Sequence, residues 1–224
     1  MRVLLFDIDG TLIRSGGAGK AAMETALRTA FGVAEVHDRV AYSGRTDPGI
    51  ARELLATHGI EPTDANAKRL KAAYLSHLPT ALASNRGCVL PGIERALGRV
   101  RRGVAIGLLT GNVRAGAEVK LRHFGLWHHF PFGAFADGLP ERDDVARLAV
   151  AEIARHVGPG VDPGDVWVIG DTPLDVQCAR AIGAKAVAVE TGWHDRAELA
   201  AARPDHILPD FTHADDLLSE WGFQ

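Results

Sequence analysis

Short apolar runs rich in β-branched residues recur along the chain, and segments with helical periodicity separate most of them. This alternation is typical of a parallel sheet whose two faces are covered by helices. The expected strands are residues 3–6, 104–110, 131–136, 166–170, 186–190 and 206–208. A chain of 224 residues with 46% hydrophobic content is long enough to bury the core of such a fold. The sequence therefore predicts an α/β fold built on a parallel sheet.

The interval between the first and second expected strands breaks this alternation. It contains amphipathic helical patterns over residues 18–31, 48–58 and 64–78, but no convincing strand that these helices could cover. The simplest explanation is an all-helical domain inserted directly after the first strand.

We place this inserted domain at residues 15–85, with residues 1–14 and 86–224 forming the α/β core. Its two connections to the core, 15–19 and 83–87, are rich in glycine and small polar residues, and together they would form a hinge. The first connection is followed by a lysine, but it lacks the glycine and hydroxyl positions of a phosphate-binding P-loop.

Charge and cysteine content exclude several classes of partner. The formal net charge is −3, from 25 basic and 28 acidic residues, so we expect neither nucleic acid nor a membrane surface as a partner. The two cysteines lack the spacing of a disulfide framework or a zinc site, which fits a cytoplasmic protein. The apolar run at the N-terminus stops at Asp7, too early for a signal sequence, and no run is long enough to cross a membrane.

The first expected strand ends in two acidic residues, Asp7 and Asp9, followed by Gly10. Because side chains alternate along an extended backbone, these two carboxylates point to the same side, and Gly10 lets the chain turn immediately afterwards. A turn at the end of a strand commonly uses one such residue rather than two. We therefore expect Asp7 and Asp9 to serve one reaction centre.

Polar residues also follow the strands expected at 104–110 and 166–170. Ligands of open parallel sheets bind beyond the carboxyl ends of the strands, so these residues should meet Asp7 and Asp9 in one crevice. Asp7 and Asp171 suit Mg²⁺, which prefers hard oxygen ligands, and the main-chain carbonyl of Asp9 could supply another. The sequence thus predicts a magnesium site formed by Asp7, Asp9 and Asp171.

An anion site is expected beside this metal site. The Thr110 hydroxyl and the backbone N–H groups of Gly111 and Asn112 precede an expected helix, where phosphate binds readily. Thr110 could instead be a helix N-cap, and Asp175 could complete a capping box with Thr172. Neither alternative accounts for Asp171.

The sequences Asp7-Ile-Asp9-Gly-Thr, Thr110-Gly-Asn and Gly170-Asp-Thr-Pro-Leu-Asp175 resemble, in order, the motifs of the haloacid dehalogenase superfamily. The helical insertion resembles the cap of its branch containing phosphoglycolate phosphatases and β-phosphoglucomutases. This resemblance implies a Rossmann-like core and a helical cap domain.

The resemblance further implies a Mg²⁺-dependent phosphatase that acts on a small phosphorylated metabolite. Asp7 would attack phosphorus to form an aspartyl-phosphate, and Asp9 would act as acid and then as base. Thr110 and Asp175 would complete the catalytic set. The second acid, Asp9, argues against the dehalogenase reaction, because displacing a halide requires no proton donor.

The third motif departs from the usual pattern, because no lysine stands at the expected place. Lys120 lies about ten residues into a helix, roughly 15 Å from the start of that helix, and Lys185 falls at the wrong end of the sheet. We expect Arg142 to replace the lysine as the catalytic cation and phosphate ligand, with Lys20 as the alternative. Arg142 could also be a surface residue paired with a neighbouring acid.

The inserted domain should choose the substrate. Gly44 and Arg45 precede an expected helix and resemble the substrate loop of the β-phosphoglucomutases. Simple helix capping by Thr46 or Asp47 explains this sequence equally well.

Two other functions remain open from the sequence. A phosphotransferase or mutase would use the same residues, with a substrate hydroxyl replacing water as the second nucleophile. A non-catalytic phosphate sensor would need neither Asp9 nor a cap, so it fits less well. The sequence names no particular substrate, and we expect a monomer or a homodimer.

Overall fold

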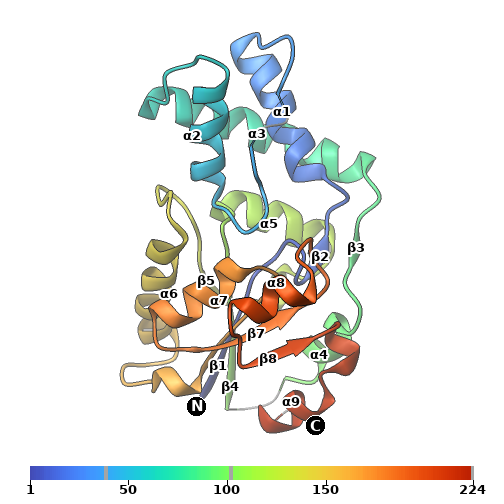
Figure 1. Cartoon of the computed structure of the whole chain (residues 1–224), viewed down its shortest axis with the longest axis vertical. Coiled ribbons are helices and arrows are strands. Elements are labelled where there is room, and N and C mark those ends of the chain that lie inside the picture. The colour runs from blue at the N-terminus through green and yellow to red at the C-terminus, as the bar shows by residue number, and fades with distance from the viewer. Residues whose placement is uncertain (38–39, 101–102, 223–224) are drawn as a thin grey trace.

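The computed structural model describes residues 1–37, 40–100 and 103–222, and its main feature is a six-stranded parallel sheet (Figure 1). The strands lie in the order β5-β4-β1-β6-β7-β8. Their bounds are β1 Arg2–Phe6, β4 Val104–Leu109, β5 Phe132–Ala134, β6 Val166–Gly170, β7 Lys185–Val189 and β8 His206–Leu208. Numbered along the chain within this sheet, the order is 3-2-1-4-5-6, that of doubly wound folds. The expected α/β fold with a Rossmann-like sheet is confirmed.

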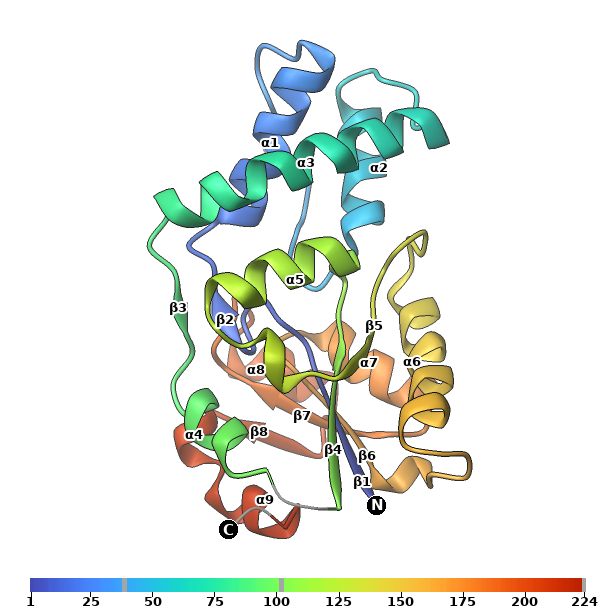
Figure 2. The same ribbon diagram turned by 180° about the vertical axis from the view of Figure 1, so that it is seen from behind.

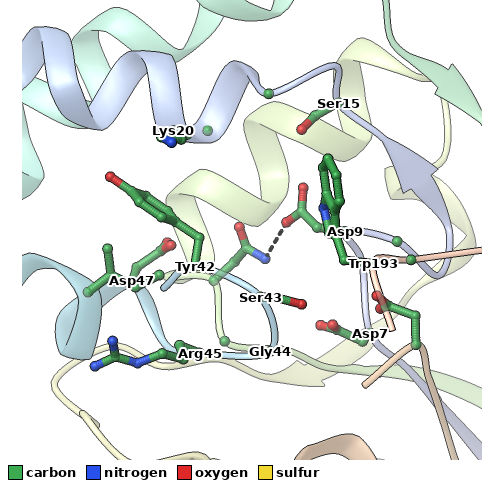
Figure 3. A pocket seen from close by; sticks show the side chains of 18 of the residues that line it. Asp7, Asp9, Ser15, Lys20, Tyr42, Ser43, Gly44, Arg45, Asp47 and Trp193 are labelled. Carbon is green, nitrogen blue, oxygen red and sulfur yellow. Dashed lines mark hydrogen bonds between the residues drawn. The ribbon is translucent and has the colours of Figure 1, made fainter. Parts of the chain in front are cut away.

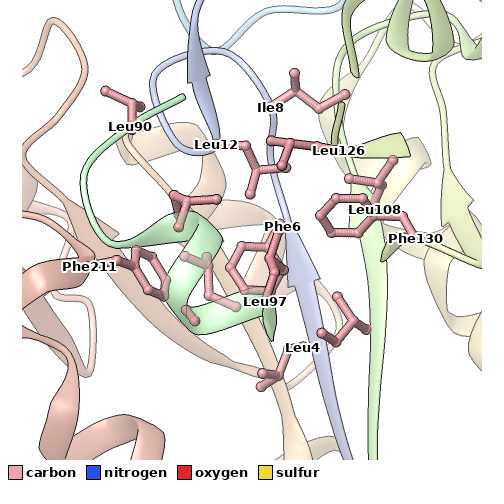
Figure 4. Close-up of a cluster of buried hydrophobic side chains, with 14 of the residues drawn as sticks. Leu4, Phe6, Ile8, Leu12, Leu90, Leu97, Leu108, Leu126, Phe130 and Phe211 are labelled. Atoms are coloured by element: carbon pink, nitrogen blue, oxygen red, sulfur yellow. The ribbon is translucent and has the colours of Figure 1, made fainter. Parts of the chain in front are cut away.

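The central strand β1 explains why this sheet must be covered on both faces. Leu4 and Phe6 pack into one hydrophobic cluster, while Val3 and Leu5 pack into a second cluster. Figure 4 shows the first cluster, in which Phe6 lies near Phe211 and Leu97. Because alternate side chains of one strand enter different cores, β1 is apolar along its whole length.

Three helices, α1 (Ala18–Phe31), α2 (Asp47–Thr57) and α3 (Asp64–Ser84), lie together beyond the carboxyl end of the sheet (Figures 1 and 2). They share a third hydrophobic cluster. The expectation that the last helix ends at Leu78 is wrong, because α3 continues through Pro79. Proline removes one intrahelical hydrogen bond, while the buried Leu82 extends the apolar face by another turn.

The two connections between these helices and the sheet lie side by side. They contain β2 (Ile13–Arg14) and β3 (Cys88–Val89), which form an antiparallel pair with Ile13 opposite Val89. Gly16 lies close to this pair with a φ of 63°, and a Cβ on it would lie 2.6 Å from the carbonyl oxygen of Arg86. The expectation of no strand in this interval is therefore wrong, because a two-residue strand is too short to show a period. The domain limits at 15–85 stay a prediction.

The remaining helices are α4 (Ile93–Gly98), α5 (Arg114–His123), α6 (Arg142–His156), α7 (Pro173–Ala181), α8 (Arg196–Ala201) and α9 (Asp215–Glu220). Figure 2 shows α5 crossing the carboxyl end of the sheet, between the strands and α3. This orientation brings the side chains of α5 close to the residues that follow the strands. Among the described residues, no helix has the length and apolar character needed to cross a membrane.

Candidate active site

Three buried carboxylates meet where β1 and β6 end. Asp7 follows β1, Asp171 follows β6, and Asp175 lies in the first turn of α7. One oxygen atom from each residue lies within 4.8 Å of the others. Two of these acids, Asp7 and Asp171, were expected as metal ligands. Asp175, which was expected in the catalytic set, has its side chain in the same cluster.

Asp171 is held in a narrow space formed by Thr11 and two glycines. The Thr11 hydroxyl donates a hydrogen bond of 3.1 Å to Asp171 Oδ1. A Cβ atom on Gly10, whose φ is 85°, or on Gly192 would overlap the Asp171 carboxylate. This backbone therefore fixes the position of Asp171 and explains the requirement for glycine immediately after Asp9.

Asp175 has a structural role and also belongs to the site. Its backbone N–H donates to Thr172 Oγ1 at 3.3 Å, and the Thr172 backbone N–H donates to Asp175 Oδ2 at 3.1 Å. This is the capping box that the sequence offered as an alternative. The other oxygen, Oδ1, forms a buried ion pair with Arg142. Capping a helix and belonging to the acidic cluster are thus compatible roles.

Arg142, the first residue of α6, is the cation of this cluster. Its side chain is buried, and its Nη1 atom lies 3.6 Å from Asp7 Oδ1 while Nη2 contacts Asp175. Arg142 is therefore not a surface residue paired with a neighbouring acid, and Asp144 pairs with Arg147 instead. Lys20, the other candidate, lies on α1 with its Nζ atom 5.8 Å from the centre of the Tyr42 ring.

The acidic cluster carries more negative charge than Arg142 offsets. Burial raises the pKa of Asp7 to about 6, and the positive charge of Arg142 opposes this shift. Burial also raises the pKa of Asp171 well above its ordinary value, and Asp175 adds to the effect. Among the described residues, nothing donates a hydrogen bond to the buried Asp7 Oδ1. Several hard oxygen atoms in an electron-rich, buried site are the donor set that a divalent cation requires.

The side chain of Asp9 is directed to other partners. Its Oδ2 atom accepts hydrogen bonds from Asn112 Nδ2 at 3.0 Å and from Lys120 Nζ at 2.5 Å. The first of these bonds is the dashed line in Figure 3. The Asp9 side chain is 38% exposed and lines the cavity. Any contribution of Asp9 to a metal site would therefore come from its main chain, as the sequence suggested.

Lys120 is the residue that sequence reasoning missed. The expectation that it lies too far away assumed that its helix runs away from the site, but α5 crosses over the site. Its side chain is 5% exposed, and Nζ also donates to Asn112 Oδ1 at 2.7 Å. A signal was present, because Lys120 falls on the same stripe of α5 as the buried Ala117 and Leu121.

Thr110 is buried beside Asp7, but it does not cap a helix. Helix α5 begins at Arg114, and its N-cap residue is Val113. The Thr110 hydroxyl accepts a bond of 2.9 Å from Asn112 Nδ2, and its hydrogen bond with Asp7 lowers the pKa of that carboxyl. The backbone N–H of Asn112 already donates to Thr110 Oγ1 at 3.3 Å. The phosphate-binding role of this segment stays a prediction.

The loop before α2 lies directly on the core. Thr46 caps α2 by accepting a bond of 3.0 Å from the Gly49 N–H, and its hydroxyl donates to the Pro140 carbonyl at 2.6 Å. A Cβ on Gly111 would overlap the carbonyl of Arg45, so the two backbones are in close contact. The capping alternative for Thr46 is therefore confirmed.

A cavity of about 800 Å³ lies between this loop, the inserted helices and the acidic residues. Gly44 and Arg45 line it, and Arg45 forms an ion pair with Glu53. Their role in binding substrate stays a prediction. Figure 3 shows the Arg45 guanidinium turned away from Asp7, and it shows Tyr42 and Trp193 on different sides of the cavity. Trp193 is 91% exposed.

The comparisons with known proteins agree with this arrangement. A family model described as haloacid dehalogenase-like hydrolase matches residues 4–180, and the chain belongs to that family. The chain is 30% identical over 212 residues to a phosphoglycolate phosphatase from Synechococcus elongatus, covering 93% of this chain and 92% of the relative. It is 27% identical to a probable phosphatase, IndB, from Dickeya dadantii, covering 94% and 90% respectively.

A solved structure of CbbY from Rhodobacter sphaeroides in complex with phosphate has the same fold. Its TM-score is 0.77 at 20% sequence identity, with 96% of this chain and 97% of that chain covered. The expected family is therefore confirmed, and the protein is a hydrolase that acts on phosphate esters.

Proposed function

We propose that this protein is a Mg²⁺-dependent phosphatase that hydrolyses a small phosphomonoester through an aspartyl-phosphate. The observation that carries the proposal is the environment of Asp7. Its Oδ1 atom is buried without a hydrogen bond from any described residue, lies beside Arg142, and belongs to a residue that lines the cavity. That buried oxygen is available to a cation, while a carboxylate on the cavity wall can present its other oxygen to an incoming phosphorus atom.

The reaction would proceed in two displacements. First, an Asp7 oxygen forms a bond to phosphorus, the ester P–O bond breaks, and Asp9 gives its proton to the departing alcohol oxygen. Second, a water molecule attacks phosphorus while Asp9 takes its proton, and the bond between phosphorus and Asp7 breaks. Inorganic phosphate leaves, and both carboxylates return to their starting states.

The metal would be held by the side chains of Asp7 and Asp171 and by the main chain of Asp9, with Asp175 nearby. A divalent cation there supplies positive charge that offsets the repulsion between the Asp7 carboxylate and the anionic phosphate. Arg142 would contribute in the same way by binding phosphate oxygens, since its two terminal nitrogens already lie between Asp7 and Asp175.

Replacing Arg142 tests this last role. We expect Arg142→Ala to lower kcat/KM at least about 100-fold, the size of effect found when one charged or hydrogen-bonding group at a transition state is removed. Arg142→Lys should recover part of the loss. Arg147→Ala provides the control, because Arg147 is an exposed residue of the same helix. Steady-state kinetics on folded variants would exclude Arg142 from the site if both kcat and KM were unchanged.

The cavity and the relatives support a proposal for the class of substrate. The curated relatives include phosphoglycolate phosphatases, and a CbbY variant was solved in complex with xylulose 1,5-bisphosphate. A volume of about 800 Å³ accommodates a substrate larger than phosphoglycolate. We therefore propose a phosphorylated small metabolite, with sugar phosphates to be tested beside phosphoglycolate. A cytoplasmic location and a monomeric or homodimeric state stay predictions.

A phosphate-release screen tests the function directly. Phosphoglycolate, sugar monophosphates and bisphosphates, nucleotides and pyrophosphate would be offered with Mg²⁺, and Asp7→Asn would serve as the blank. Phosphate release from a phosphomonoester, absent in the blank, supports the proposal. Isomerised β-glucose 1-phosphate without free phosphate would instead indicate a mutase, and no turnover of any compound would contradict both.

A further inference from the structure

We propose that Lys120 is a positioning residue for Asp9, and that Asp47, the first residue of α2, completes this arrangement when the start of α2 lies on the core. The proposal rests on the proposed function, because it concerns how the general acid is held. It assigns a task to a buried lysine that the two displacements described above do not use.

The first argument is the contact itself. Lys120 Nζ lies 2.5 Å from Asp9 Oδ2, and Asn112 Nδ2 donates to the same oxygen at 3.0 Å. Both bonds end on one oxygen atom, so they fix the rotation of the carboxylate while the second oxygen remains for exchanging a proton with the substrate. A carboxylate that must give and take a proton in two successive steps gains from such fixed geometry.

The second argument is that Lys120, Asp9 and Asn112 form a closed set of three hydrogen bonds. Lys120 Nζ also donates to Asn112 Oδ1 at 2.7 Å, which fixes which side of the amide faces Asp9. Asn112 Nδ2 in turn contacts Thr110 Oγ1 at 2.9 Å, next to the proposed nucleophile. The acid and the nucleophile are thus connected through one short network.

The third argument concerns the start of α2. Asp47 Oδ2 accepts a bond of 2.8 Å from the Val113 N–H, and the Asp47 N–H donates to the Gly111 carbonyl at 2.7 Å. These contacts bring a second carboxylate close to Lys120, whose positive charge opposes the rise in the pKa of Asp47 that burial causes.

The buried Lys120 therefore forms an ion pair with Asp9 from the core, and its positive charge also acts on Asp47 at the start of α2. The contacts of Asp47 with the core exist only while the start of α2 lies against it, and the same holds for the bond from Thr46 to Pro140. The charge around Lys120, and through it the placement of Asp9, consequently depends on the position of the start of α2. This dependence would favour acid catalysis when the cavity is covered.

A comparison of leaving groups separates this role from a merely structural one. p-Nitrophenyl phosphate needs little help from an acid, whereas an alkyl phosphate needs its leaving oxygen protonated. We expect Lys120→Met to lower kcat/KM for the alkyl phosphate about 100-fold and for p-nitrophenyl phosphate less than about 3-fold. Asp9→Asn should show the same selectivity to a greater extent. Lys68→Met, at an exposed lysine of α3, should change neither value.

Two further variants keep the test decisive if Lys120→Met does not fold. Lys120→Arg retains the charge and should recover activity toward the alkyl phosphate relative to Lys120→Met. Asp47→Asn retains an oxygen for the Val113 N–H but loses its charge, so it should give a loss of about 3- to 10-fold confined to the alkyl phosphate.

The outcomes distinguish the two proposals. Suppose that Asp9→Asn shows selectivity between the two substrates. The positioning role would then be overturned if the Lys120 and Asp47 variants lost activity equally toward both substrates, or lost none. If the wild-type protein hydrolysed neither compound, or if Asp9→Asn showed no preference between them, the proposed function itself would fail.

Discussion

Asp7→Asn should abolish turnover, with kcat falling at least about 10⁴-fold, because a neutral carboxamide cannot replace the carboxylate as nucleophile. The substitution preserves side-chain size, and it removes one of three buried negative charges that lie within 4.8 Å of one another. We therefore expect the variant to fold and to melt at a temperature equal to or above that of the wild type.

The measurement is phosphate release over time with the best substrate of the screen, alongside thermal unfolding. Rapid acid quenching followed by mass analysis should find a phosphoryl group on the peptide containing residue 7 in the wild type alone. Asp216→Asn, at an exposed aspartate of α9, is the control. Activity of Asp7→Asn close to that of the wild type would rule out Asp7 as the nucleophile.

Removing divalent metal should lower kcat more than about 10³-fold, since a cation at such a site supplies several kcal/mol of stabilisation to the transition state. Added Mg²⁺ should restore activity and raise the melting temperature, because it binds the folded chain alone. Asp171→Asn should lose both responses. It should also melt no lower than the wild type in chelator, since it removes a carboxyl group whose charged form is disfavoured by burial and by Asp175. Full activity in chelator would contradict the metal requirement.

The metal-free protein should also show an unusual dependence on pH. Burial raises the pKa of Asp7 from 3.8 to about 6, so its proton is bound more tightly in the folded state. Its contribution to stability is complete below pH 3.8 and is lost as the pH rises through 6, which amounts to about 1–2 kcal/mol between pH 5 and 7.5. Thermal unfolding in chelator should therefore occur at a higher temperature at pH 5 than at pH 7.5. The opposite order would show that Asp7 is not the dominant titrating group.

The strands were predictable because each is encoded by a few adjacent residues. All six strands of the parallel sheet form within about two residues of their expected ends. The pair β2 and β3 was not predictable, because two residues show no period. The passage of α3 through Pro79 depends on Leu82, which packs against residues distant in the sequence.

In the candidate site, too, some features could be predicted from the sequence and others could not. Asp7, Asp171 and Asp175 could be placed together because the topology of a parallel sheet brings the carboxyl ends of its strands to one edge. Arg142 was predicted from the order of the family motifs, since it lies just before an expected helix in the interval that precedes the last acidic motif. Arg45 could be placed at the cavity, but its ion pair with Glu53 could not be read from the sequence.

By itself, the sequence determined the sheet, the helical insertion and the acidic residues at the strand ends, because periodicity and motif spacing are local properties. The tertiary structure alone decided the partners of Asp9. Lys120 reaches this carboxylate because α5 crosses the end of the sheet, where it packs against α3 and, through Ala117 and Leu121, against the core. The number of residues between two positions gives their separation along the helix axis. Only tertiary packing determines which other parts of the protein the side chains of that helix contact.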